Sequence, residues 1–261
     1  MKNSIKSLAA IAAFAAAAFS AHAQVVSGTS DLILGFSNAA NNQSVLVNIG
    51  SINNYTTSAV VGTSFVTDVS SVLNAAFGTG AAWNTVKWGV VGTAGVGGPA
   101  TNGDPASTEW ITSKYSAGAG TLGVKHSTAY ANASGSALNT GAGKVNNLYD
   151  ALLSATPAQT TGNAVTTGDN VWNANAPFNL SATNFTQTIG TLASGQTYSA
   201  ADLYTMKAST AAIFDGTFSL DSSSGILSFT VIPEPSTYAA LLGAATLGFA
   251  ALRRRKQALV A

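Results

Sequence analysis

The stretch 216–231, GTFSLDSSSGILSFTV, decides the fold of this chain. Apolar and polar side chains alternate on both sides of its Ser-rich centre, which is typical of strands with one buried face. The segments 216–221 and 225–231 are therefore predicted to pair as an antiparallel β-hairpin around residues 222–224.

Five more segments outside this hairpin have the composition of strands. The segments 30–36 and 44–50 flank an Asn-rich connection, so they are predicted to form a second hairpin. Three further segments are rich in β-branched and aromatic residues, and they are predicted as strands at 85–92, 109–115 and 184–192.

Helical spacing is rarer in this chain than strand alternation. The segment 64–78 places apolar residues three or four apart before Gly78, a plausible C-cap. The segments 144–155 and 199–207 are predicted as two more helices, the latter with Ser199 and Asp202 in the outline of a capping box. Together the patterns predict a mainly β domain, β-sandwich-like or α+β, with two or three short helices.

The composition indicates one domain between two special termini. The chain has 261 residues, no cysteine and 8% charged residues. Residues 24–232 contain five lysines, no arginine and nine acids, which leaves a net charge of −4. Because nucleic acids are bound by basic surfaces that neutralise phosphates, this composition excludes nucleic-acid binding. The lack of cysteine fits both a reducing compartment and an exported protein without disulfides.

The N-terminus has the three parts of a secretory signal peptide. Lys2 and Lys6 form a basic start, residues 8–19 are apolar, and Ala21 and Ala23 form a small-x-small cleavage site. The sequence therefore predicts a signal peptide at 1–23 and an exported domain at 24–232.

The C-terminus combines prolines, an uncharged run and a basic cluster. Pro233 and Pro235 flank Glu234 and favour an extended backbone. The uncharged run 236–252 would span about 25 Å as a helix, the short limit for a bilayer core of roughly 30 Å. The cluster Arg253-Arg254-Arg255-Lys256 would stay cytoplasmic and place the domain outside. A transmembrane helix is therefore predicted, as a permanent anchor behind a stiff spacer or as a transient one.

The order of these features resembles a known sorting signal. Pro233-Glu234-Pro235-Ser236-Thr237, a short apolar helix and a terminal basic cluster are similar to the PEP-CTERM sorting signal, over the segment 233–256 alone. The resemblance implies processing by an exosortase in bacteria that usually also make exopolysaccharide. It implies that Pro233, Glu234 and Pro235 are the recognition residues, that cleavage falls close to them and that the helix is transient.

The sequence contains no convincing catalytic arrangement. Residues 118–123 match a dinucleotide fingerprint by letters but lack the helix and the acid that should follow. His126 is the one histidine of the domain, and the chain has neither a G-x-S-x-G motif nor a cysteine nucleophile. No cofactor or metal site is expected, since structural zinc needs more histidines or cysteines.

Two weaker possibilities for the domain stay open. The acid pairs Asp104 with Glu109, or Asp215 with Asp221, would suit a glycoside hydrolase if they faced each other across a cleft. The tryptophans offer a second route, because aromatic faces stack on sugar rings. Trp88 and Trp110 lie in apolar strand patterns and are expected in the core, whereas Trp83 and Trp172 are the surface candidates for a glycan contact.

These observations favour a non-enzymatic, exported surface or extracellular-matrix protein with a structural or adhesive role. Its partners would be an exosortase, the inner membrane during processing, and exopolysaccharide. The alternative is a secreted polysaccharide-binding protein or an acid-pair glycoside hydrolase. The mature protein is expected at the cell surface or outside the cell.

Overall fold

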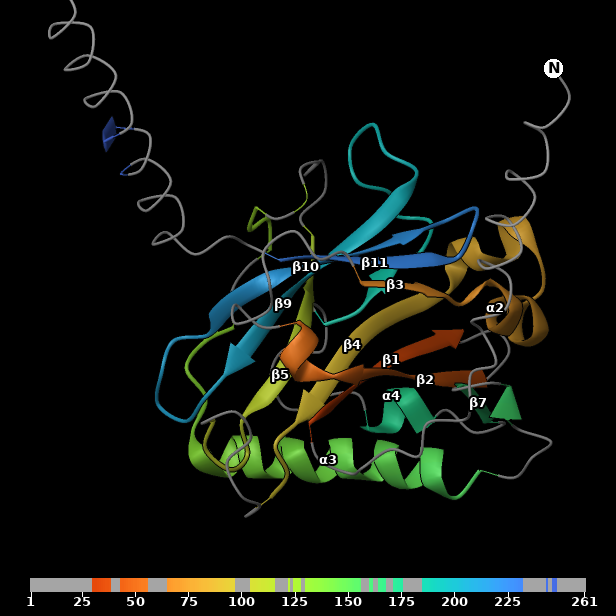
Figure 1. Ribbon diagram of the computed structural model, residues 1–261. Helices are drawn as coiled ribbons and strands as arrows, with labels where there is room; N and C mark the ends of the chain where they lie inside the picture. Colours follow the sequence, from red (N-terminus) through yellow and green to blue (C-terminus); the bar gives the residue numbers. More distant parts are fainter. Residues whose placement is uncertain are drawn as a thin grey trace, which may run out of the picture.

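The computed structural model shows one curved β-sheet with a few helices against it (Figure 1). It describes residues 30–38, 43–55, 65–96, 104–115, 122, 124–127, 130–155, 160–161, 164–167, 171–175, 185–231, 243 and 246–247. The predicted signal peptide at 1–23, with Ala21 and Ala23, lies outside the described residues, as do the sorting motif and the basic cluster.

The described strands number eleven and the helices are few. The strands are β1 (Asp31–Asn38), β2 (Gln43–Ser51), β3 (Phe65–Asp68), β4 (Lys87–Thr93), β5 (Glu109–Lys114), β6 (Thr160–Thr161), β7 (Ala164–Thr167), β8 (Gln187–Thr188), β9 (Tyr198–Met206), β10 (Ile213–Asp221) and β11 (Ile226–Val231). The α-helices are α2 (Ser70–Phe77), α3 (Gly135–Leu153) and α4 (Val171–Asn175), and the 3-10 turns are η1 (Ile52–Asn54) and η2 (Gly80–Thr85).

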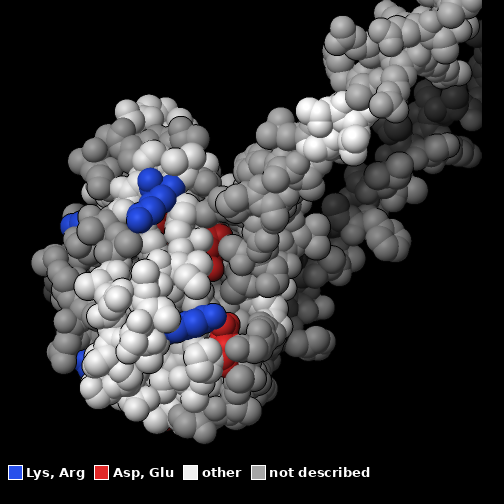
Figure 2. Space-filling model, turned by 90° about the vertical axis from the view of Figure 1, so that its left-hand side faces the viewer, with Lys and Arg blue, Asp and Glu red and all other residues white. Residues whose placement is uncertain are grey.

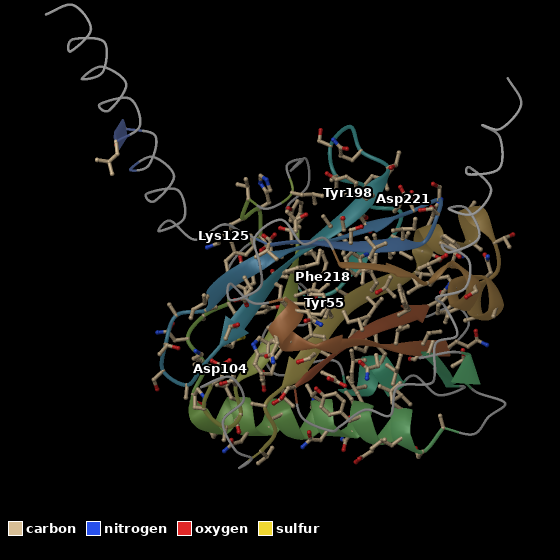
Figure 3. The ribbon with its side chains drawn as sticks, viewed as in Figure 1. Tyr55, Asp104, Lys125, Tyr198, Phe218 and Asp221 are labelled. Carbon is tan, nitrogen blue, oxygen red and sulfur yellow. The ribbon has the colours of Figure 1, made fainter. Side chains whose placement is uncertain are left out.

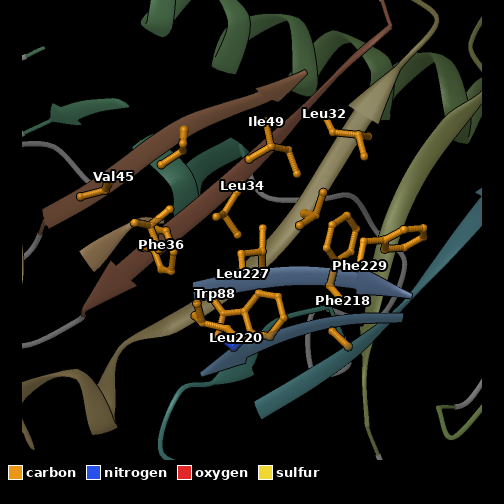
Figure 4. Packing of buried hydrophobic residues seen from close by; sticks show 14 of the residues in the cluster. Leu32, Leu34, Phe36, Val45, Ile49, Trp88, Phe218, Leu220, Leu227 and Phe229 are labelled. Carbon is orange, nitrogen blue, oxygen red and sulfur yellow. The ribbon is translucent and has the colours of Figure 1, made fainter. Parts of the chain in front are cut away.

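The strands form one antiparallel sheet in the order β3-β11-β10-β9-β5-β4-β1-β2-β7-β6, with β8 added beside β4. The prediction of a mainly β fold is confirmed. The expected form is β-sandwich-like or α+β; the structure has a single, nearly closed sheet, which curls until β10 and β11 lie across the core from β1 and β2 (Figure 4).

The hairpin at 216–231 forms as predicted and faces this inner core. Its register pairs Phe218 with Phe229 and Leu220 with Leu227. All four side chains are at most 3% exposed, and the two phenylalanine rings lie 4.5 Å apart. Alternation along each strand therefore places one apolar row inside the curve of the sheet, where it packs against β1, β2 and β4.

A second apolar layer lies between the outer face of the sheet and α3. Ile33, Val91 and Ile111 come from three neighbouring strands and pack with Leu138 and Val145 of the helix. Helix α3 is longer than the segment 144–155 that was predicted. It begins after Ser134, whose hydroxyl accepts a hydrogen bond from the Ala137 N–H at 3.2 Å.

The predicted helix at 199–207 is wrong, since this segment is strand β9. It lies between β5 and β10 and pairs with both, so the neighbouring strands supply its backbone hydrogen bonds. Its alternate residues Ala201 and Leu203 enter the inner core, while Met206 joins the outer layer. Tertiary pairing here overrides the helix-favouring composition.

Two other predicted boundaries are wrong. The predicted helix at 64–78 is helical only from Ser70 on, as α2. Residues 65–68 form strand β3 instead, because they pair with β11. Gly78 does terminate α2, with a positive φ of 86°. Within 184–192 only Gln187–Thr188 pairs as a strand, because the chain then turns at Gly190.

None of the helices in the described part of the chain combines the length and apolarity needed to cross a membrane. The transmembrane helix predicted at 236–252 lies outside the described residues except for Gly243, Thr246 and Leu247. It stays a prediction.

Candidate functional site: the sorting tail and the polar clusters of the domain

The sorting tail starts directly from the sheet. Strand β11 ends at Val231, which is 6% exposed and pairs with Gly216 of β10. Pro233, Glu234 and Pro235 follow after a single intervening residue, although they lie outside the described residues themselves. The described domain and the sorting signal are thus joined without a long linker.

The most extensive buried polar cluster of the domain is centred on Asp202 of β9, whose side chain is fully buried on the outer face of the sheet. Its Oδ2 accepts hydrogen bonds from the backbone N–H groups of His126 and Ser127 at 2.8 and 2.9 Å, and from the Ser127 hydroxyl at 2.7 Å. Its Oδ1 accepts the Thr217 hydroxyl at 2.9 Å. Three of these four donors belong to residues 126–127 and fix this segment against the sheet.

Aromatic residues surround the Asp202 cluster. The Ser127 hydroxyl lies 2.8 Å from the Tyr204 hydroxyl, and the ring of His126 lies 5.0 Å from that of Tyr115. The pKa of Tyr204 is raised to about 12, first by burial and also by the nearby Asp202 carboxylate, against the lowering hydrogen bond to Ser127. With its oxygens taken up by donors, Asp202 suits a structural anchor better than a general base.

His126 was the one histidine that a hydrolytic triad could have used. In the structure its backbone N–H is held by Asp202, and its Nε2 is buried with no hydrogen-bond partner among the described residues. The Ser127 hydroxyl is engaged by Asp202 and Tyr204. The side chains of Ser127 and His126 therefore form no nucleophile–base hydrogen bond.

The two acids of each predicted pair have different surroundings. Asp215 and Asp221 lie on one strand, β10, about 20 Å apart at strand spacing. Asp104 forms an ion pair of 2.6 Å with Lys207, whereas Glu109 is fully buried. The pKa of Asp215 is raised to about 7, chiefly by burial, and the nearby charge of Asp104 also raises it.

The Asp215-Gly216 pair favours a turn by its sequence, but the structure places Asp215 inside a strand. Asp215 lies inside β10, where the pairing with β9 shifts register between Phe214 and Gly216. Such a bulge inserts an extra residue, and here the extra residue is 2% exposed. Its Oδ2 accepts the hydroxyl of Thr205 at 2.6 Å. The carboxyl group is a buried, hydrogen-bonded acid of the domain interior.

Asp221 ends β10 and accepts hydrogen bonds from the turn that follows it. Its Oδ1 accepts hydrogen bonds from the backbone and side chains of Ser223 and Ser224. Burial alone would raise the pKa of Asp221, but hydrogen bonds from Ser224, Ser223 and Thr197 together lower it. The side chain closes the β10–β11 hairpin (Figure 3), as Asp does in Asx-turns.

Glu109 is a further buried acid, after Asp202 and Asp215. Its side chain is fully buried, and neither carboxyl oxygen has a hydrogen-bond partner among the described residues. Burial raises its pKa to about 8, while the backbone of Ala142 in α3 acts in the opposite direction. Glu109 is therefore a neutral acid between the sheet and α3 at neutral pH.

The expectation that Trp83 and Trp172 are exposed is wrong. Trp83 is 2% exposed because η2 folds onto the inner core, where its indole N–H donates to the carbonyl of Gly78 at 2.6 Å. Trp172 is fully buried between α4 and the outer face of β1. Neither ring offers a free face to a sugar. Trp88 and Trp110 are in the core as predicted.

No cluster of three metal-ligating side chains occurs within the ranges that the structure describes. The described residues thus form a mainly β domain with structural polar clusters.

The comparisons with known proteins concern the tail. Residues 231–256 match the family model of the PEP-CTERM protein-sorting motif, which confirms the resemblance seen in the sequence. The match starts at Val231, the last residue of β11, and ends at Lys256, the last residue of the basic cluster. Neither a search of curated proteins nor a search of solved structures found a match.

Proposed function

We propose that this chain is the precursor of an exported, non-enzymatic protein whose tail is cut by an exosortase. The observation that carries the proposal is the complete PEP-CTERM motif at 231–256, directly after the last strand of a folded domain. Pro233, Glu234 and Pro235 are the recognition residues. The helix at 236–252 inserts into the inner membrane, with Arg253, Arg254, Arg255 and Lys256 on its cytoplasmic side.

The domain then acts at the cell surface or in the extracellular matrix, in a structural or adhesive role, with exopolysaccharide as a partner. Three features support this part of the proposal. The chain has no cysteine, its buried acids are placed as structural groups, and the described charged side chains are few. A structural or adhesive protein needs a stable fold and a binding surface, but no catalytic residue.

The processing step is tested by expressing the full chain with an exosortase. The unaltered chain should be shortened, while a triple variant P233A/E234A/P235A should keep its tail and stay in the membrane fraction. Gln257→Ala is the matched control, because it lies beyond the matched motif, and it should be processed normally. Equal processing of the triple variant would contradict the assigned recognition residues.

The role of the domain is tested by its removal. Cells that express the precursor without the segment 30–231 should attach to a surface less and hold less matrix polymer. Unchanged attachment, together with cleavage of a polysaccharide by the purified domain, would favour the hydrolase alternative instead.

A further inference from the structure

The end of β11 lies on one rim of the curved sheet. Because every pairing is antiparallel, β4 and β9 also end at this rim, and β5 and β10 begin there. We call the described residues 94–96, 104–108 and 207–213, together with Val231, the tail rim. It lies on the left-hand side of Figure 1, and Asp104 is labelled there in Figure 3.

The tail rim has little charge. Its charged members are Lys207 and Asp104, which neutralise each other in an ion pair of 2.6 Å. The neighbouring acids Glu109 and Asp215 are at most 2% exposed. Figure 2 looks at this side of the molecule, and most of its described surface is uncharged.

Apolar side chains project from the same rim. Ile213 at the start of β10 is 46% exposed, and Val96 after β4 is 50% exposed. Between β9 and β10 the turn 208–212 reads Ala-Ser-Thr-Ala-Ala, so its side chains are small and uncharged. Such a surface has few charged groups to desolvate. Its transfer from water to the polar boundary of a bilayer therefore costs little free energy.

The tail limits how far the rim can lie from the membrane. Five residue steps separate Val231 from Ser236, where the predicted membrane helix begins. Even a fully extended chain spans at most about 18 Å over five steps. The tail rim is the part of the domain nearest to this tether.

We propose that the tail rim, through Ile213, Val96 and the turn 208–212, rests on the lipid surface while the tail is in the membrane. The inference deepens the proposed function, since it requires the helix at 236–252 to insert. The contact orients the precursor, with the opposite rim facing away from the bilayer. Cleavage at the sorting motif then releases the rim along with the domain.

The absence of cysteine allows a direct test of this orientation, because a single introduced thiol can carry a fluorescent label. The full chain is reconstituted into vesicles of phosphatidylethanolamine and phosphatidylglycerol that contain lipids with a quencher in the acyl chain. Ala211→Cys labels the tail rim. Ala81→Cys, an exposed position in η2 at the opposite rim, is the matched control.

The label at position 211 should be quenched several-fold more than the label at position 81. A flexible insertion of about twelve Gly and Ser residues after Val231, which adds a root-mean-square reach of roughly 20 Å, should reduce this difference if the tether sets the contact.

In the chain without the insertion, Ile213→Asp should weaken quenching at position 211. Ile226→Asp, a matched change on an exposed isoleucine at the far end of β11, should not.

A third label, Ala244→Cys, reports on the tail itself. Strong quenching at position 244 with equal, weak quenching at positions 211 and 81 would overturn the inference and leave the proposed function intact. A label at position 244 that stays in water would overturn both the inference and the predicted membrane insertion.

Discussion

At the scale of single residues, the buried acids are the most unusual feature of the domain. Glu109 and Asp215 are both enclosed, and burial raises the pKa of the first to about 8 and of the second to about 7. Asp215 has a hydroxyl donor, whereas Glu109 has no partner among the described residues. Each keeps its proton in the folded state at a pH where it would lose it in the unfolded chain.

This has a defined consequence for stability against pH. The pKa of Glu109 is higher in the folded state than its ordinary value of 4.5, so the folded state binds the proton more tightly. Its contribution to stability is present below pH 4.5 and is lost as pH rises toward 8. Glu109→Gln should therefore be more stable than the unaltered domain at pH 9, by up to about 5 kcal/mol, and similar to it at pH 4.

The measurement is the free energy of unfolding in urea across this pH range. Asp150→Asn, an exposed acid on α3, serves as the control and should follow the unaltered domain. If Glu109→Gln and the unaltered domain lose stability in parallel above pH 5, the buried acid is not the cause.

Asp202 differs from Glu109, because four hydrogen-bond donors surround its buried carboxyl group. In Asp202→Asn the amide must turn an N–H₂ group toward either the donors of residues 126–127 or the hydroxyl of Thr217. We expect a loss of about 2–4 kcal/mol in stability. Limited proteolysis should show earlier cleavage at 122–127, and resistance equal to that of the unaltered domain would contradict the anchoring role.

At the scale of elements, the packing of α4 onto β1 depends on one glycine. A Cβ on Gly35 would lie 2.0 Å from the Trp172 ring, so the indole lies directly on the backbone of the strand. Gly35→Ala should cost about 3 kcal/mol or more, because either the ring or the strand must move.

Gly143 in α3 is the matched control for this substitution. A Cβ there meets nothing within 4 Å. Gly143→Ala should stabilise the domain by about 0.5–1 kcal/mol, since alanine is the better helix former. Thermal unfolding of the two variants should move in opposite directions, and a similar loss in both would show that Trp172 does not depend on the missing side chain.

Elements with a strong local pattern could be predicted from the sequence. The hairpins β1–β2 and β10–β11 alternate clearly, and both form. Strand β9 could not be predicted, because its Ser-Ala-Ala-Asp start also suits a helix and only pairing with β5 and β10 decides between them. The burial of Trp83 and Trp172 could not be predicted for a similar reason, since the local composition does not show against which surface a short helix packs.

The functional features follow the same division. The sorting motif is a linear signal that is read along the chain, so the sequence alone could identify it. The Asp202 cluster joins residues about 75 positions apart, and its local sequence, which also suits a helix, gives no sign of it. Long-range contacts of this kind require the fold.

At the scale of the whole molecule, we propose a folded β domain that is delivered by a tail and then freed of it. The domain ends at Val231 and the matched motif starts at the same residue, so cleavage near the motif leaves the sheet complete.

Intact-mass analysis of the protein recovered outside the cell tests this central claim most directly. The account predicts a mature chain that starts at Gln24 and ends close to Pro233–Pro235, without the apolar run and the basic cluster. A mass that still includes Arg253 to Ala261 would contradict it, and the tail would then be a permanent anchor rather than a processed signal.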